Sequence, residues 1–265
     1  MTTRPSFDTG ASAYDRFMGR WSRLFIPALL AAGQVGPRQR VLDVATGTGE
    51  ATLSAASLVG PSGWVLGVDL SLPMLRAARA KVAGKPVGLA AMDGQALACK
   101  DETFDVVLCQ LGLMFFPDVL RGLEEFRRVL RPGGRVAVCV WSTRQRVPLI
   151  GILAEALGRH VPHYLQDVNL GFSLGDPHRL ASLLTSAGFH DVSVRAETRE
   201  CVFESFDEYW APVEAGGGRL GQIYRELDDQ ARRAVADEVR QRLSEFESEG
   251  RLLLKPEALI AAGSR

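Results

Sequence analysis

The feature that most constrains the fold is an apolar run that ends abruptly in a glycine-rich turn. Residues 41–50 read Val-Leu-Asp-Val-Ala-Thr-Gly-Thr-Gly-Glu. The first part is typical of a buried strand, and Gly47 and Gly49 allow backbone to approach a ligand closely. About 20 residues further on, a second apolar run ends in a lone acid, Asp69. This pattern predicts a pocket for a nucleotide-like ligand at the carboxyl edge of a parallel sheet.

Strand-like and helical patterns alternate up to residue 141, which favours βαβ units and a mainly parallel sheet. Near-continuous apolar strands indicate a sheet that is covered on both faces. Together with two later strands, the sequence predicts an α/β fold: a Rossmann-like, doubly wound, mainly parallel seven-stranded sheet with helices on both faces and a helical cap. The predicted strands are Arg40–Ala45, Val65–Asp69, Val87–Ala91, Phe104–Gln110, Arg135–Trp141, Asp191–Thr198 and Glu257–Ala262. The predicted helices of the first half are Glu50–Leu58, Ser71–Val82 and Asp118–Leu130.

The pattern changes after residue 141. Helical periodicity is found in Val147–His160, Pro177–Ala187, Glu204–Val213 and Asp228–Glu249, whereas residues 161–176 look rich in loops and Gly216-Gly217-Gly218 looks flexible. We therefore expect an N-terminal helical lid (1–37), a cofactor-binding core (38–141) and a third part (142–265). The third part would hold the rest of the sheet and two inserted cap segments, at about 142–176 and 203–250.

Charge and composition exclude some partners. Lys plus Arg equals Asp plus Glu at 31 each, so the chain has no general field to hold a polyanion, which argues against nucleic acid. No apolar run reaches the ~20 residues that span a bilayer, and the polar N-terminus does not resemble a signal peptide. The four cysteines are scattered without a C-x-x-C pair, which disfavours a structural zinc site or disulfides. We expect a cytoplasmic protein, either a monomer or a homodimer.

The ligand differs from a dinucleotide. A dinucleotide fingerprint needs a third glycine, but Thr52 stands at that position. Asp43, four residues before Gly47, would repel a pyrophosphate and suits a cationic amino group. A nucleoside joined to an amino acid satisfies both observations.

Three further polar positions follow the predicted strands. Asp69 is placed to accept hydrogen bonds from both hydroxyls of a ribose. Asp93 could accept from an exocyclic amino group, and Gly94 would let an adenine ring lie close. Gln110, at the end of the fourth strand, would point toward the reacting centre.

These motifs, with Leu130-Arg131-Pro132-Gly133-Gly134 before the fifth strand, resemble the class I S-adenosylmethionine-dependent methyltransferases. The resemblance is closest to the branch related to the ubiquinone/menaquinone C-methyltransferases and covers residues 7–141 best. It implies S-adenosylmethionine as cofactor and S-adenosylhomocysteine as product.

The resemblance also assigns roles to individual residues. Asp43 and Gly47 would line the methionine end of the cofactor, and Asp69 would hold the ribose. Leu70 and Met74 would lie against one side of the adenine, opposite Asp93 and Gly94. Many relatives have Gly-Cys where this chain has Ala45-Thr46; because Ala45 keeps a small side chain, we expect cofactor binding to survive. The N-terminal helix with Tyr14, Met18 and Trp21 would be a lid over the cofactor, or else a simple docking helix on the sheet.

Methyl transfer from a sulfonium needs alignment and a dry site, with no metal and no covalent intermediate. Candidates for work on the acceptor side are Tyr14, Trp141, His160, His163, Tyr209 and Trp210. Among them Tyr14, His163 and Tyr209 are candidate catalytic residues if a general base is needed. Pro162 separates His160 from His163, which argues against a metal site on one helical face.

The sequence leaves several functions open. An apolar, aromatic cap favours a small ring-bearing or lipophilic methyl acceptor, with O-, N- and C-methylation all open. The alternatives are an RNA methyltransferase, a protein that binds the cofactor without turnover, and a nucleotide-dependent oxidoreductase. The cap segments could instead form a dimer interface.

Overall fold

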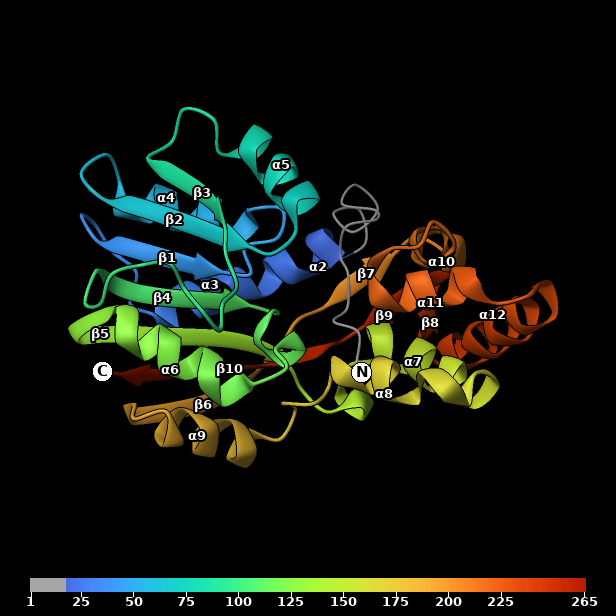
Figure 1. The fold of residues 1–265 in the computed structure, drawn as a ribbon. Helices are drawn as coiled ribbons and strands as arrows, with labels where there is room; N and C mark the ends of the chain where they lie inside the picture. The colour runs from blue at the N-terminus through green and yellow to red at the C-terminus, as the bar shows by residue number, and fades with distance from the viewer. Residues whose placement is uncertain (1–17) are drawn as a thin grey trace.

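The computed structural model of the chain describes residues 18–265, in which a seven-stranded sheet carries a helical layer on each face (Figure 1). The strand order is β3-β2-β1-β4-β5-β10-β6. All neighbours are parallel except β10, which runs antiparallel to both β5 and β6. The predicted α/β fold with a mainly parallel sheet is therefore confirmed. The strands are β1 Arg40–Val44, β2 Trp64–Asp69, β3 Val87–Ala91, β4 Phe104–Gln110, β5 Leu130–Trp141, β6 His190–Thr198 and β10 Glu257–Ser264.

The strand order reverses between β1 and β4. From β1 the chain adds β2 and β3 on one side, and then returns to place β4 on the other side of β1. Val41 of β1 pairs with Val65 of β2 and with Val106 of β4. In open α/β sheets, the loops that leave adjacent strands in opposite directions leave a crevice at the carboxyl ends.

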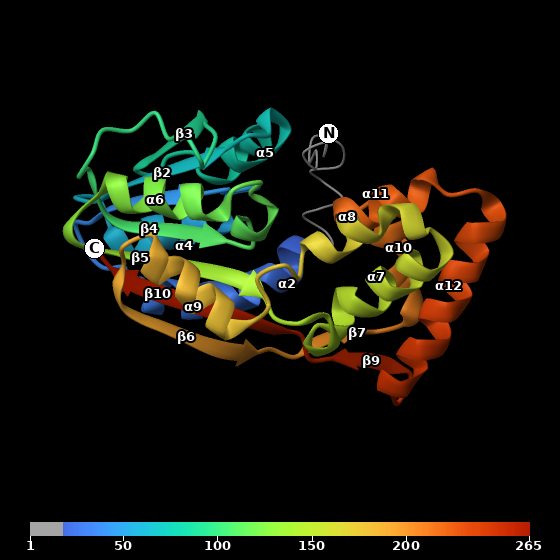
Figure 2. The ribbon, with the colours of Figure 1, turned by 60° about the horizontal axis from the view of Figure 1, so that its bottom comes forward.

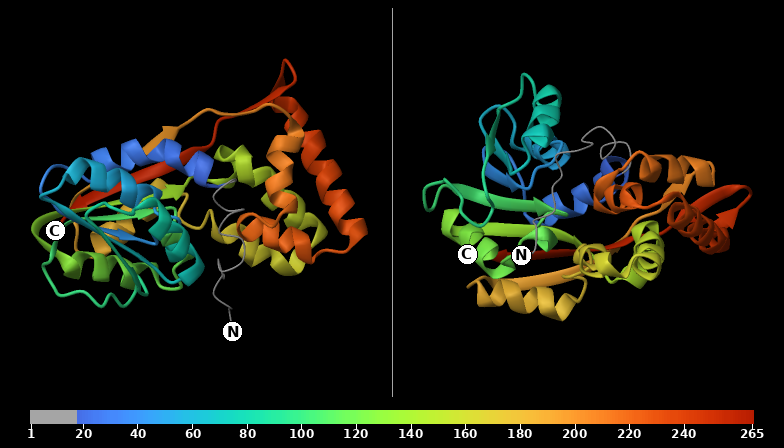
Figure 3. Two further views of the ribbon diagram at one scale, coloured as in Figure 1. Left: turned by 90° about the horizontal axis from the view of Figure 1, so that it is seen from above. Right: turned by 45° about the vertical axis from the view of Figure 1, so that its right-hand side comes forward.

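Helices bury both faces of the sheet, which is why β1 and β4 are apolar almost throughout. Helices α3 (Ile26–Ala32) and α4 (Glu50–Val59) cover one face, and α6 (Val119–Val129) and α9 (Pro177–Ser186) cover the other (Figure 3, left). Helix α5 (Leu72–Lys81) packs on β2 and β3.

Capping residues set where these helices begin. The Ser71 hydroxyl accepts from the Met74 backbone N–H at the start of α5. Asp118 and Asp176 cap α6 and α9 in the same way.

The helical cap, residues 144–170 and 201–254, lies beyond the carboxyl ends of the strands (Figure 2). Ion pairs join its two parts, from Arg159 to Glu238 and from Arg242 to Glu155. A hydrogen bond between His160 and Glu238 adds to them. The two inserted segments thus fold against each other. The helices of the cap are α7 Pro148–His160, α8 Leu165–Leu170, α10 Phe206–Glu214, α11 Gly218–Glu226 and α12 Asp229–Leu243.

Three expectations for this part of the chain are wrong in detail. Residues 161–176, expected to be mostly loop, contain a short 3₁₀ turn (Pro162–Tyr164) and α8. Gly218, expected in a flexible run, begins α11. The last predicted helix ends at Leu243, and the chain then forms β8 (Glu247–Ser248) and β9 (Arg251–Leu254).

Strand β9 pairs with both β8 and β7 (Cys201–Phe203) in a small three-stranded sheet. Strands of two to four residues are too short to show a period, and the pairing of β7 with β9 joins residues about fifty positions apart in the chain.

The described N-terminal segment connects the sheet to the cap. It consists of α2 (Arg20–Ser22), a 3₁₀ turn (Arg23–Phe25) and α3. The Trp21 ring lies 4.3 Å from the Phe203 ring, and Phe25 contacts Trp141 edge-on at 5.6 Å. Across residues 18–265, we find no helix with the length and apolar character of a membrane span.

Candidate active site

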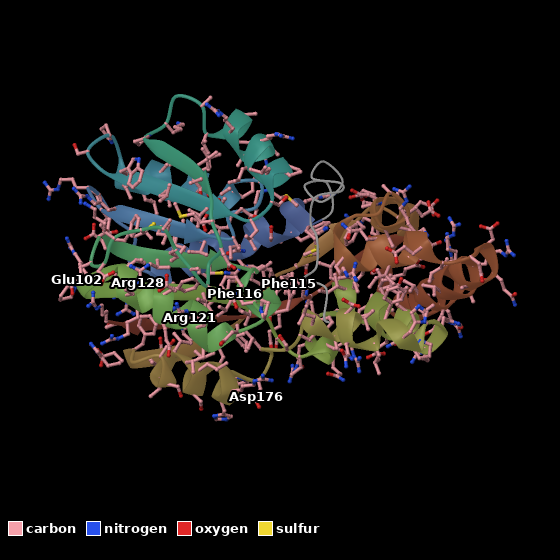
Figure 4. The ribbon with its side chains drawn as sticks, viewed as in Figure 1. Glu102, Phe115, Phe116, Arg121, Arg128 and Asp176 are labelled. Atoms are coloured by element: carbon pink, nitrogen blue, oxygen red, sulfur yellow. The ribbon has the colours of Figure 1, made fainter. Side chains whose placement is uncertain are left out.

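A cavity of about 430 Å³ opens where β1 and β4 end, between the sheet and the cap. Its wall is contributed by the segments that follow β1, β2, β3 and β4, by the end of β5, and by α7, α8 and α11 of the cap. Figure 4 shows Phe115 and Phe116 at this end of the sheet, whereas Glu102 and Arg128 lie at the opposite end. The predicted position of the site, at the carboxyl edge of the sheet, thus coincides with a cavity.

Asp69 lies on the cavity wall with its carboxylate oriented by backbone. One oxygen accepts from the Gly47 N–H at 2.8 Å, and the other accepts from the Ser71 N–H at 2.9 Å. Asp69 thereby ties the turn after β1 to the start of α5. A carboxylate fixed at the end of the second strand suits recognition of a ribose.

The turn after β1 places three residues in the left-handed region, namely Ala45, Gly47 and Gly49. Gly47 has φ 55°, which costs a glycine nothing, but Ala45 has φ 57°. For a residue with a Cβ, this conformation costs roughly 1–2 kcal/mol. Leu111, after β4, is also left-handed, at φ 52°. Ala45, Gly47 and Leu111 all line the cavity, so two of the left-handed non-glycine residues lie where β1 and β4 end.

Asp43 lies beneath this turn and does not line the cavity. Its side chain is completely buried, and one oxygen accepts from the hydroxyls of Thr46 at 2.8 Å and Thr52 at 2.6 Å. Its other oxygen has no hydrogen-bond partner among the described residues. We expected Asp43 on the wall at the methionine end; instead it holds the turn in place from below.

Burial raises the pKa of Asp43 to about 6, because desolvation of the carboxylate outweighs the two threonine hydrogen bonds. The nearby charge of Asp69 raises it further. Cys109 on the neighbouring strand also has a raised pKa, chiefly through burial. It is therefore a buried, protonated thiol.

The residues expected around an adenine all line the cavity. Leu70 is 58% exposed and lines the cavity, which leaves an apolar face for a ring. Met74 is buried behind it. Asp93 accepts from the backbone and side-chain amides of Gln95, at 2.9 and 3.2 Å. The predicted adenine residues thus form one end of the cavity.

The structure gives a packing reason for glycine at position 94 that the sequence alone did not reveal. A Cβ on Gly94 would lie 2.4 Å from the Phe116 ring, and a Cβ on Gly122 would lie 2.5 Å from the same ring. The ring therefore fits between two glycines and packs edge-on against Phe126 at 6.0 Å. The structure thus ties Gly94 to Phe116, in addition to any contact with an adenine.

Gln110 lines the cavity at the end of β4. Its amide donates to the Ser22 carbonyl at 2.9 Å, and its side-chain carbonyl oxygen is buried without a partner among the described residues. Gln110 thus joins the sheet to the N-terminal segment that carries Met18, another cavity residue.

Two of the three candidate catalytic residues, His163 and Tyr209, lie within the described residues. Tyr14 lies outside the described residues. His163 is exposed on the turn before α8 and packs on Tyr164 at 4.4 Å. The buried Tyr209 donates its hydroxyl to the Leu149 carbonyl at 3.0 Å, and desolvation raises its pKa. Neither His163 nor Tyr209 lines the cavity.

Sequence patterns alone did not reveal the charged residues on the cap side of the cavity. An ion pair joins Arg219 of α11 to Asp167 of α8, with Nη2 and Oδ1 3.1 Å apart. The signal for Arg219 was a basic residue directly after three glycines. Apolar side chains form the rest of this side, namely Met114, Trp141, Ile150, Val168, Phe172 and Leu220. Within the part of the chain that is described, no three His, Cys, Asp or Glu side chains gather as a metal site.

Comparison with known proteins agrees with this geometry. The family model for a methyltransferase domain matches residues 42–138. The chain is 37% identical to the ubiquinone/menaquinone biosynthesis C-methyltransferase of Geobacter sulfurreducens, over 60% of this chain and 68% of that protein. It is 33% identical to the demethylmenaquinone methyltransferase of Roseiflexus castenholzii, over 71% of this chain and 85% of that protein.

Solved structures share the fold at lower identity. A methyltransferase structure from Bacillus halodurans superposes with a TM-score of 0.62 at 18% identity, covering 90% of this chain and 97% of that one. A phosphoethanolamine N-methyltransferase of Haemonchus contortus gives 0.61 at 18% identity, covering 98% of this chain and 57% of that one. With the curated relatives, the glycine turn and the oriented Asp69, these matches show that the chain belongs to the class I S-adenosylmethionine-dependent methyltransferases and is a relative of the quinone C-methyltransferases.

Proposed function

We propose that this methyltransferase acts on a small ring-bearing or lipophilic molecule. The observation that carries the proposal is the apolar lining of the cap side of the cavity, where Trp141, Ile150, Phe172 and Leu220 line the same space as Met114. Apolar pockets with a few polar groups are typical sites for drug-sized ligands. The relatives named for demethylmenaquinone support a ring in the acceptor.

The residues of the sheet fit the expected cofactor. Asp69 would hold the ribose, while Ala45 and Gly47 offer close approach to backbone. Leu70, Met74, Asp93 and Gly94 would surround the adenine, and Gln110 would face the reacting centre. Asp43 would act indirectly, because it holds the turn from below through Thr46 and Thr52. The role of Tyr14 in a lid over the cofactor remains a prediction from the sequence. When bound, S-adenosylmethionine supplies an activated methyl group on a sulfonium.

The protein's own contribution is orientation and exclusion of water. The cap and the carboxyl edge of the sheet together line the space in which an acceptor would meet the cofactor. No His, Cys, Tyr, Lys or Glu is among the described residues that line it. Asp167 is the carboxylate on the cap side, so a nucleophile that needs deprotonation would depend on Asp167 or on solvent.

Thermal-shift and turnover measurements test this proposal together. Purified protein is heated with S-adenosylmethionine, S-adenosylhomocysteine or NAD, and then incubated with labelled S-adenosylmethionine and a panel of phenols, quinols, amines and transfer RNA. We expect stabilisation by the first two ligands and methyl transfer to a ring-bearing acceptor. Stabilisation by NAD instead, transfer to RNA, or tight binding without transfer to any acceptor would contradict the proposal.

A further inference from the structure

The charged groups on the cavity wall fall into two sets. Asp69 and Asp93 lie at the carboxyl ends of the strands, on the side proposed for the cofactor. Asp167 and Arg219 come from α8 and α11, which lie side by side in the cap (Figure 2). They are the charged groups that the described part of the cap contributes to the cavity. Polar recognition of an acceptor therefore falls mainly to this pair.

The Arg219 guanidinium has more donors than the protein uses. Its side chain is 21% exposed, and its contact with Asp167 is its one ion pair among the described residues. Its Nε–H is shielded from solvent and has no hydrogen-bond acceptor. A guanidinium carries five N–H donors in a fixed fork. Leaving such donors without acceptors in a partly buried site costs free energy unless a ligand accepts hydrogen bonds from them.

The charge balance selects the kind of ligand group. Three carboxylates line the described cavity, namely Asp69, Asp93 and Asp167, against the single guanidinium of Arg219. A carboxylate or phosphate on the acceptor would enter a cavity with an excess of negative charge, and Asp167 already neutralises the arginine. An uncharged hydroxyl matches the pair better, since it can accept from Arg219 and donate to Asp167 at once.

We propose that the Arg219–Asp167 pair is the polar anchor of the acceptor site, and that it binds an uncharged hydroxyl on a ring whose apolar body contacts Phe172, Leu220 and Ile150. The inference rests on the proposed function, because it assumes that the acceptor occupies the cap side of the cavity. It adds that the acceptor carries a neutral hydroxyl rather than an acidic group.

Calorimetry on the full chain tests the anchor. Affinity for S-adenosylhomocysteine is measured first, and then affinity for 2-naphthol, naphthalene and 2-naphthoate in protein saturated with S-adenosylhomocysteine. We expect 2-naphthol to bind about tenfold more tightly than either of the other two. Arg219→Met and Asp167→Asn should each remove this preference and leave S-adenosylhomocysteine affinity within about twofold. Two variants are used so that one poorly folded protein does not decide the result.

Arg232→Met is the matched control. Arg232 of α12 also pairs with an aspartate, Asp229 at 3.2 Å, and its Nε–H also lacks an acceptor, but it does not line the cavity. This variant should keep the preference for 2-naphthol. An unchanged preference in both test variants, a preference for 2-naphthoate, or no binding of 2-naphthol would overturn the anchor while the cofactor site stands. Failure of the unaltered protein to bind S-adenosylhomocysteine would instead refute the proposed function.

Discussion

Replacing Asp69 by alanine tests the central contact of the proposed cofactor site. The carboxylate is fixed by the Gly47 and Ser71 N–H groups at 2.8 and 2.9 Å, so it is oriented before a ligand binds. Hydrogen bonds to a charged group contribute roughly 1.5–3 kcal/mol each. Loss of two ribose hydroxyl bonds at the lower figure amounts to about 3 kcal/mol, or a dissociation constant roughly 150-fold higher.

Titration calorimetry with S-adenosylhomocysteine measures this change. Asp69→Asn keeps the shape of the side chain but removes its charge, so its affinity should fall between those of the parent and the alanine variant. Asp237→Ala, at an exposed position of α12, is the control and should bind as the parent does. If folded Asp69→Ala binds S-adenosylhomocysteine within about twofold of the parent, the ribose contact assigned to Asp69 is refuted.

Three further changes test the surroundings of the site. Gly94→Ala should displace the Phe116 ring and weaken S-adenosylhomocysteine binding. Gly122→Ala crowds the same ring from α6 and should mainly lower the free energy of unfolding, by about 1–3 kcal/mol. Equal losses of binding in both variants would argue against a local effect at Gly94. Because the pKa of Asp43 is raised to about 6, its ionised form destabilises the native state above that pH. Urea unfolding should therefore show the stability advantage of Asp43→Asn shrinking by about 1 kcal/mol between pH 7.5 and pH 5, and a growing advantage would contradict this sign. Tyr209→Phe removes the hydrogen bond to the Leu149 carbonyl. It should lower the free energy of unfolding by about 1 kcal/mol and leave kcat and KM unchanged. A large fall in kcat would return Tyr209 to the catalytic candidates.

Much of the sheet could be predicted because its signals are local. The apolar runs ending at Val44, Asp69 and Gln110 lie within one residue of the predicted strand ends. Parallel strands buried on both faces carry such runs in the sequence itself. Since the carboxyl ends of parallel strands meet at one edge, the sequence alone places Asp69, Asp93 and Gln110 at the same edge of the sheet.

The cap could not be predicted in the same way. Its sheet joins Cys201–Phe203 to Arg251–Leu254, and α8 has only six residues, too few to show a clear period. Residue type alone suggests catalytic candidates but does not place them. In the structure His163 is exposed away from the cavity, and the buried Tyr209 donates its hydroxyl to the Leu149 carbonyl.

By itself, the sequence determined the α/β sheet, its carboxyl-edge pocket and the acid at the end of β2, because each depends on residues that are neighbours in the chain. The tertiary structure alone decided that Asp43 lies under the turn, that Phe116 fits between Gly94 and Gly122, and that Arg219 meets Asp167. The Phe116–Gly94 and Arg219–Asp167 contacts join residues tens of positions apart, and packing rather than local pattern sets all three arrangements.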